Sequence, residues 1–145
     1  MNTPLTDSFV NVQLTANFWL DELIFSDFYS PRNQEKVLES FYDDNLFEQA
    51  KKLAEHLQVI RDHLGCAVSV NIAYRPKWWE LKQGRSGASQ HVLMLAGDIV
   101  SEDHSPKQVF DAIEFLIETG KIKEGGLHAY NSFVHTDTRG RKARW

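Results

Sequence analysis

Apolar residues recur at helical spacing in the middle of the chain. An apolar side chain returns every three or four positions, at Leu46, Ala50, Leu53, Leu57, Ile60 and Leu64. This spacing is the buried stripe of an amphipathic helix. With Asp43 or Asp44 as the N-cap and Gly65 after the last turn, the pattern predicts a helix over residues 45–64.

A second amphipathic helix is predicted after Ser105, because a capping residue is followed there by a proline at the first helical position. Gly120 ends this helix, and its expected buried face consists of Val109, Phe110, Ile113, Leu116 and Ile117. His56 and His63 lie off the apolar stripe of the first helix. We therefore expect both histidines at the surface.

The N-terminal third carries weaker patterns. Residues 1–15 are polar and are expected to be extended. Asn17 is a candidate N-cap for a short helix over residues 18–26. Residues 27–43 are expected to be irregular, since Pro31 interrupts them.

Strand patterns appear in the second half of the chain. Residues 67–73 alternate in polarity and are rich in β-branched side chains, which predicts a strand. A further strand is predicted over residues 94–100. A hairpin follows, with strands over 126–130 and 133–138 joined by a turn at Asn131-Ser132.

A long loop is predicted over residues 77–90, and it holds Trp78 and Trp79. Adjacent tryptophans in such a loop fit either the wall of a substrate groove or ordinary packing. Taken together, the elements predict an α+β fold. We expect one domain over residues 1–145, with a small, mainly antiparallel sheet flanked by helices.

Composition limits the possible functions. The chain has 145 residues, 42% apolar content and a net charge of −4, which suits a globular domain and gives no reason to expect nucleic-acid binding. Cys66 is the single cysteine, so no internal disulfide is possible. No secretory signal and no apolar run of about 18 residues is found, so we expect cytoplasmic synthesis and no membrane span.

A basic cluster near residue 140 fits either a solvated tail or a docking edge for an anionic partner, and its members are Arg139, Arg141, Lys142 and Arg144.

Two imidazoles and a carboxylate are candidates for a zinc site. A catalytic zinc takes three protein ligands from histidine and acidic residues and keeps one position for water. His91, Asp98 and His135 offer such a set. His91 and Asp98 are seven residues apart, about 23 Å along a regular strand, so both reach one metal only if His91 lies in a segment that folds back.

Strand geometry predicts which side chains surround His135. Residues two apart share a face, so His135 and Asp137 point the same way. If the hairpin turn has two residues, His128 lies directly across from His135 on that face. The patch would then hold His128, His135 and Asp137 together.

Several motifs give the chain a resemblance to a known family. One run contains Ser89, His91, Met94, Ala96 and Asp98; a later run contains Gly125, Gly126, His128, Tyr130, His135, Asp137 and Arg139. Earlier matches are Asn17, Phe18, Glu22, Leu23, Tyr74 and Arg75. In this order they resemble the M15 zinc peptidases, which include D-alanyl-D-alanine carboxypeptidases and phage endolysins. The chain looks most like subgroup A of that family, with its Hedgehog and DD-peptidase type of fold.

The resemblance implies a function and roles for particular residues. It implies that His91, Asp98 and His135 bind Zn²⁺, and that the substrate is an amide bond in the stem peptides of bacterial peptidoglycan. Asp137 is the first candidate for the general base, and Glu80 is the second. Arg75 is the candidate partner for a substrate carboxylate or the developing oxyanion.

The chain departs from the family pattern where the family has glycine. Met94 and His128 replace glycines of the two zinc motifs, and Ile72-Ala73 replaces the serine and glycine before Tyr-Arg. His128 is therefore a candidate fourth ligand, which would close the site and make the zinc structural. The alternative to an enzyme is a non-catalytic phage virion or assembly protein that keeps the fold, with a degenerate or structural metal site and self-assembly or virion partners. An enzyme would act at host lysis or from the virion.

Overall fold

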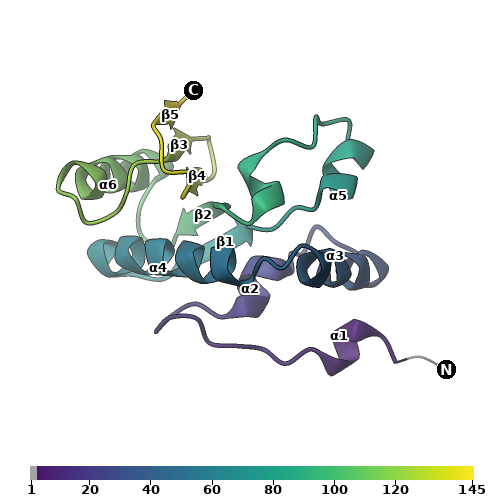
Figure 1. The fold of residues 1–145 in the computed structure, drawn as a ribbon. Helices are drawn as coiled ribbons and strands as arrows, with labels where there is room; N and C mark the ends of the chain where they lie inside the picture. The colour runs from purple at the N-terminus through teal and green to yellow at the C-terminus, as the bar shows by residue number, and fades with distance from the viewer. Residues whose placement is uncertain (1–2) are drawn as a thin grey trace.

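A computed structural model describes residues 3–145. The helices are α1 (Leu5–Ser8), α2 (Leu20–Ile24), α3 (Pro31–Asp43), α4 (Phe47–Leu64), α5 (Lys77–Lys82), the 3-10 helix η1 (Gln90–Leu93) and α6 (Pro106–Glu118). The strands are β1 (Val68–Ile72), β2 (Ala96–Ser101), β3 (Gly126–Ala129), β4 (Val134–Asp137) and β5 (Ala143–Arg144). Helices and one sheet thus combine in an α+β fold, as predicted (Figure 1).

The sheet has the strand order β1-β2-β4-β3-β5. Neighbouring strands are antiparallel except for β3 and β5, which are parallel. The register places Asp98 opposite His135, and His135 opposite His128. Tyr130 donates its backbone N–H to the Phe133 carbonyl at 2.8 Å, so the hairpin turn has the predicted two residues.

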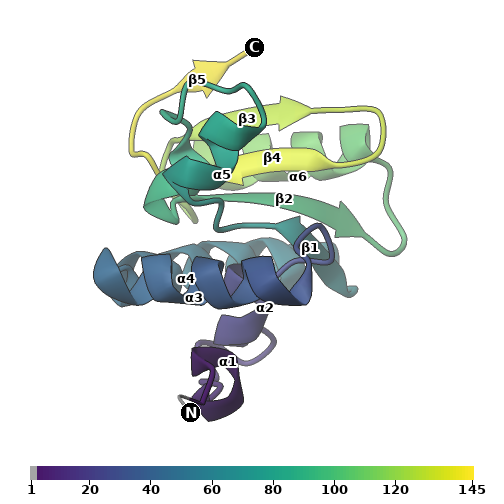
Figure 2. The same cartoon turned by 90° about the vertical axis from the view of Figure 1, so that its right-hand side faces the viewer.

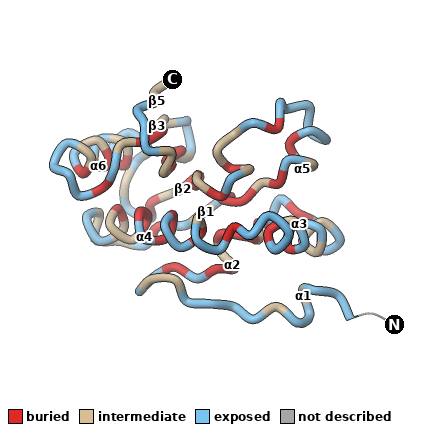
Figure 3. The backbone as a smooth tube through the Cα atoms, viewed as in Figure 1, coloured by how far each residue is buried: buried red, intermediate tan, exposed pale blue. Residues whose placement is uncertain are grey.

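Helix α6 covers one face of the sheet and lies behind β3 and β4 in Figure 2. Helix α4 packs beside α6 and contacts the same face through His56 and Thr136 of β4. The apolar stripe of α4 packs there because it removes a continuous row of side chains from water. Leu57 lies beside Gly97 of β2. Buried positions accordingly gather on β2 and on the inner sides of the helices (Figure 3). The opposite face of the central strands is left for polar side chains.

Three predictions about the first half of the chain are wrong. Residues 31–43 form a regular helix, because Ser30 accepts a hydrogen bond from the Asn33 N–H and Pro31 occupies the first turn. The first residues are not wholly extended, since α1 forms where the Glu35 carboxylate accepts the N–H groups of Leu5 and Thr6. The cap of α2 is Trp19 instead of Asn17.

Other elements differ from their prediction in detail. Helix α4 begins at Phe47, after Asn45 in a left-handed conformation, so neither Asp43 nor Asp44 is its N-cap. Gly65 ends it with φ +69, as expected. The predicted long loop contains α5 and the start of η1.

The tryptophans of α5 are half-buried and pack against the core. Trp78 donates its indole N–H to Ser40 at 2.8 Å, and Trp79 packs edge-on against Tyr29 at 5.0 Å between ring centroids. The packing interpretation is therefore confirmed. No helix within residues 3–145 combines the length and the apolar character needed to cross a membrane.

The basic cluster near residue 140 is not a free tail. Arg144, in β5, forms ion pairs of 2.7 Å with both Glu114 and Glu124. Arg139 pairs with Asp137 at 2.7 Å. These contacts hold the last segment of the chain against α6 and the hairpin.

Candidate metal centre

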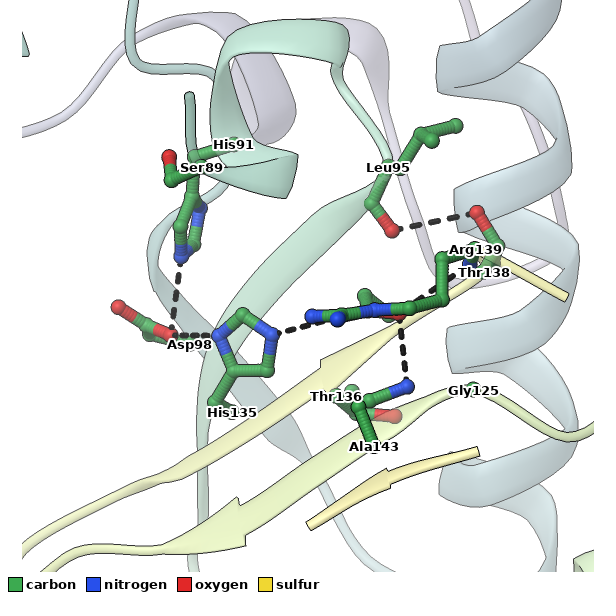
Figure 4. A network of polar contacts seen from close by, with 12 residues as sticks. Ser89, His91, Leu95, Asp98, Gly125, His135, Thr136, Thr138, Arg139 and Ala143 are labelled. Carbon is green, nitrogen blue, oxygen red and sulfur yellow. Dashed lines mark hydrogen bonds and ion pairs between the residues drawn. The ribbon is translucent and has the colours of Figure 1, made fainter. Parts of the chain in front are cut away.

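Three side chains converge on the face of the sheet opposite α4. His91 Nε2 lies 3.3 Å from Asp98 Oδ1, and His135 Nδ1 lies 3.4 Å from the same oxygen (Figure 4). One possible ligand atom from each residue lies within 4.8 Å of the others. All three side chains are largely buried. Asp98 and His135 meet because they are opposed in the register of β2 and β4.

The turn between η1 and β2 brings His91 to Asp98. Met94 has φ +58, a left-handed conformation that reverses the chain after η1. Its N–H and that of Leu95 donate to the carbonyls of His91 and Gln90. The chain thus folds back between His91 and Asp98, as their separation of seven residues requires if both are to bind one metal. A glycine at position 94 would adopt the same conformation without steric cost.

Each imidazole is held by its other ring nitrogen. His91 Nδ1 lies 2.7 Å from the Ala73 carbonyl oxygen, and His135 Nε2 lies 2.8 Å from Asp137 Oδ2. Because a carbonyl and a carboxylate accept hydrogen bonds, these nitrogens carry the protons. When both rings are neutral, as metal ligands must be, His91 Nε2 and His135 Nδ1 are left with lone pairs on the side of Asp98. Imidazoles that bind a metal are oriented by contacts of this kind.

Asp137 lies behind His135 instead of in the space between the three converging side chains. Its fully buried carboxylate accepts hydrogen bonds from the Gly126 N–H at 2.8 Å and from the Arg139 guanidinium. Burial raises the pKa of Asp137. The hydrogen bonds from His135, Arg139 and the Gly126 N–H lower it by more, so the pKa lies well below its usual range. The strand pattern correctly predicted that Asp137 lies beside His135. Residue spacing could not predict the hydrogen bonds that occupy both oxygens of Asp137.

The charges within the cluster are coupled. Burial raises the pKa of the Asp98 carboxyl, but the adjacent His135 and His91 outweigh it and hold the pKa below its usual range. For His135, burial lowers the pKa, while Asp137 and Asp98 raise it above the ordinary value. Asp98 Oδ1 is nevertheless buried, and no group of residues 3–145 forms a hydrogen bond of good geometry with it. Such an oxygen facing two lone pairs suits a divalent cation.

His128 does not join the three ligand candidates. Although it pairs with His135 in the register, its ring stacks on Trp145 at 5.3 Å and packs edge-on against Tyr130 at 4.4 Å. Within residues 3–145, the group of possible ligands comprises His91, Asp98 and His135. The side of the cluster facing the cavity is therefore not closed by a fourth imidazole.

Arg75 and Glu80 form a second polar unit at the edge of this site. Arg75 Nε donates to Glu80 Oε2 at 2.7 Å, and the Ser89 hydroxyl donates to the same oxygen. Burial raises the pKa of Glu80, but Ser89 and Arg75 lower it below the ordinary value overall. Glu80 is 1% exposed and does not reach the cavity, whereas Arg75 and Ser89 do. The serine of the first zinc motif thus links the turn that carries His91 to α5, a role that sequence reasoning missed.

A cavity of about 510 Å³ opens beside the cluster. The α5–η1 segment forms one wall, and the hairpin with the following segment forms the other. His91 belongs to the first wall and His135 to the second, and Asp98 of β2 lies between them. Trp145 packs edge-on against His135 at 5.0 Å and donates its indole N–H to the Tyr130 hydroxyl.

His56 lies in the core under the site, which corrects the surface prediction. Its Nε2 is 2.8 Å from the Thr136 hydroxyl of β4. Burial lowers the pKa of His56 to about 4, against a smaller opposing effect of Asp137, so its ring is neutral at pH 7. His63 is exposed, as predicted.

Comparison with known proteins identifies the family of this chain. The Peptidase M15 family matches residues 29–137, which include the three converging side chains. The chain belongs to this family, and membership supports a peptidase activity. Neither the curated proteins nor the solved structures gave a significant match. The assignment to subgroup A stays a prediction.

Replacing Met94 with glycine is expected to destabilise the fold. The substitution relieves a left-handed conformation that costs about 1–2 kcal/mol, but it removes a fully buried side chain worth about 2–5 kcal/mol. A net loss of about 0–4 kcal/mol, about 2 kcal/mol at the middle of these ranges, should appear in urea unfolding of the zinc-free protein. Asn45→Gly is the control, because Asn45 also has positive φ but is exposed, and its change should stay within about 0.5 kcal/mol. A variant M94G more stable than the natural chain would contradict this balance.

Replacing Gly126 with alanine is expected to weaken metal binding. A Cβ at this position would overlap the Asp137 carboxylate and lie 2.7 Å from Arg139 Nη2. Displacing Asp137 frees His135 to rotate, so affinity for zinc should fall about tenfold or more. In Gly97→Ala, the added Cβ would meet only ordinary contacts at 3.8 Å, although it lies next to Asp98. Equal zinc affinity in the two variants, measured by competition with a chelating dye, would refute this role of Gly126.

Proposed function

We propose that this protein is a zinc-dependent peptidase that hydrolyses an amide bond in the stem peptides of bacterial peptidoglycan. The observation that carries the proposal is the convergence of His91, Asp98 and His135 beside an open cavity. Two imidazoles with their protonated nitrogens already engaged, and one carboxylate oxygen without a hydrogen bond from the described part of the chain, form a donor set that zinc prefers. Family membership supports the peptidase class.

Three protein ligands with an open side characterise catalytic zinc sites, whereas structural sites are closed by four. His91 Nε2, His135 Nδ1 and Asp98 Oδ1 would hold the ion. Bound there, zinc would supply Lewis acidity that polarises the scissile carbonyl and lowers the pKa of water to about 7.

In this proposal the residues around the metal orient the His135 ring and bind the substrate. Asp137 is a positioning residue: it holds the proton on His135 Nε2 and so keeps Nδ1 free. Its oxygens are committed to His135, Arg139 and Gly126, which argues against the general base role expected from the sequence. Arg75 lines the cavity and offers its guanidinium to a substrate carboxylate or oxyanion, while Glu80 fixes its position.

One observation favours the second candidate, a metal-binding protein without hydrolytic activity. Of the described residues that line the cavity, Asp98 is the single acidic one. Peptide hydrolysis needs a group that takes a proton from water and passes it to the leaving amine. Glu80 contacts two residues of the cavity wall but is buried behind them. A virion or assembly protein that kept the fold would need no such group.

The two candidates are separated by an assay for new amino groups. Purified peptidoglycan and a synthetic stem pentapeptide are incubated with zinc-loaded protein, with chelated protein and with variant H135A, and the products are identified by mass spectrometry. The peptidase proposal expects cleavage by the zinc-loaded natural chain alone. Zinc bound at one ion per chain without cleavage of either substrate would refute it and favour the second candidate.

A further inference from the structure

The charge of the cavity is opposite in sign to that of the whole chain. The chain carries 16 basic and 20 acidic residues, with a net charge of −4. The described cavity lining contains one acidic residue, Asp98, and four arginines: Arg75, Arg85, Arg139 and Arg141. A basic cavity in an acidic protein selects for anionic ligands and raises their local concentration.

Two of the four guanidinium groups already have a carboxylate partner within the protein. Arg75 is paired with Glu80, and Arg139 contacts both oxygens of Asp137. Arg85 and Arg141 have no side-chain hydrogen bond or ion pair to any residue in 3–145, and both are exposed. Their charge is therefore available to a ligand.

The two available arginines come from different parts of the chain. Arg85 lies in the loop between α5 and η1, which forms one wall of the cavity. Arg141 lies between β4 and β5, in the other wall. A guanidinium binds a carboxylate through two parallel hydrogen bonds, which fixes orientation as well as charge. A peptide lying across the metal centre would present its carboxylates to these walls.

We infer that Arg85 and Arg141 are specificity residues that bind free carboxylates of the substrate. The preferred substrate is an acidic peptide, with carboxylates on either side of the scissile amide, and its amidated form is a poor substrate. This inference rests on the proposed peptidase function for the position of the scissile bond. The preference for carboxylate over carboxamide can be measured without cleavage.

The test uses two matched peptides and the full zinc-loaded chain. The acidic probe is L-Ala–γ-D-Glu–L-Lys–D-Ala–D-Ala, and in the neutral probe its carboxylates are carboxamides. Variants R85Q, R141Q and the double variant are compared with Arg32→Gln. Arg32 is exposed on α3 and lies outside the cavity lining, so its replacement changes the net charge equally. Where a probe is cleaved, kcat/KM is measured; where it is not, Kd is measured by calorimetry.

The natural chain should prefer the acidic probe by about tenfold or more, as expected for a lost charge-assisted hydrogen bond. Each of R85Q and R141Q should reduce this preference several-fold, and the double variant should abolish it, while R32Q keeps it. Equal treatment of the two probes by the natural chain would overturn the inference, and so would an equal loss in R32Q. If the chain binds the acidic probe preferentially but cleaves neither probe, the inference stands and the peptidase proposal is refuted. If it cleaves both probes equally well, the peptidase proposal stands and the inference is refuted.

Discussion

Replacing His135 with alanine is expected to remove bound zinc completely, from about one ion per chain to none, and to abolish any hydrolysis. His135 supplies the Nδ1 lone pair that faces Asp98, and no other imidazole of the described residues can take its place. Two remaining ligands do not make a stable zinc site, because three protein ligands are the usual minimum. Elemental analysis of protein purified without chelators gives the result directly.

His128→Ala is the matched control for this experiment. His128 is opposed to His135 on the same face of the sheet, but its ring stacks on Trp145. We expect H128A to keep its zinc. Loss of zinc in both variants, with the fold intact by circular dichroism, would make His128 a fourth ligand and the site structural. Zinc retained by H135A would show that the ion binds elsewhere.

Replacing Asp137 with asparagine is expected to damage stability and metal binding together. The carboxylate is fully buried and forms hydrogen bonds with His135, Arg139 and the Gly126 N–H. Removing one partner of a buried ionic network costs about 3–5 kcal/mol, because the other charges remain buried without compensation. Loss of a carboxylate that orients a metal-binding imidazole lowers metal affinity about 10- to 100-fold. Urea unfolding of the zinc-free chain and a zinc competition assay measure the two effects separately.

The effect of pH gives an independent check on the same residue. The pKa of Asp137 is lower in the folded protein than in the unfolded chain, where it is about 4. Its contribution to stability is therefore present above about pH 4 and is lost as the pH falls further. The gap between the natural chain and D137N should narrow on acidification. Asp111→Asn, which breaks an exposed ion pair with Lys107, should change stability by less than about 1 kcal/mol. A D137N variant as stable as D111N would exclude the buried network.

The strand alternation and the hairpin turn could be predicted because each depends on local geometry, whereas the zinc motifs were predicted from the resemblance to a known family. Period-two alternation placed His135 and Asp137 on one face, and a two-residue turn set His128 against His135. The error over residues 31–43 had a local cause as well. Proline breaks a helix interior, which is the basis of the irregular segment predicted there, but a proline directly after a capping serine starts a helix.

Other features depend on segments that are distant in sequence. His56 is buried because Thr136, 80 residues away, offers its hydroxyl where α4 crosses β4. The commitment of Asp137 to Arg139 and Gly126, and of Glu80 to Ser89, likewise appears only when the hairpin and α5 are in place. The sequence identified these two carboxylates as candidate general bases. Their burial and their hydrogen-bond partners decide whether either can accept a proton from water.

The sequence by itself determined the α+β class, because hydrophobic period is a local property of the chain, and its motifs determined the family and, through it, the three residues expected to hold zinc. The tertiary structure decided which ring nitrogens face the cluster and that His128 stands apart from it. It also decided that two arginines without a side-chain partner in residues 3–145 flank the cavity. These features follow from strand register and packing between distant segments. Such contacts form only when the whole chain is folded, so no short stretch of sequence encodes them.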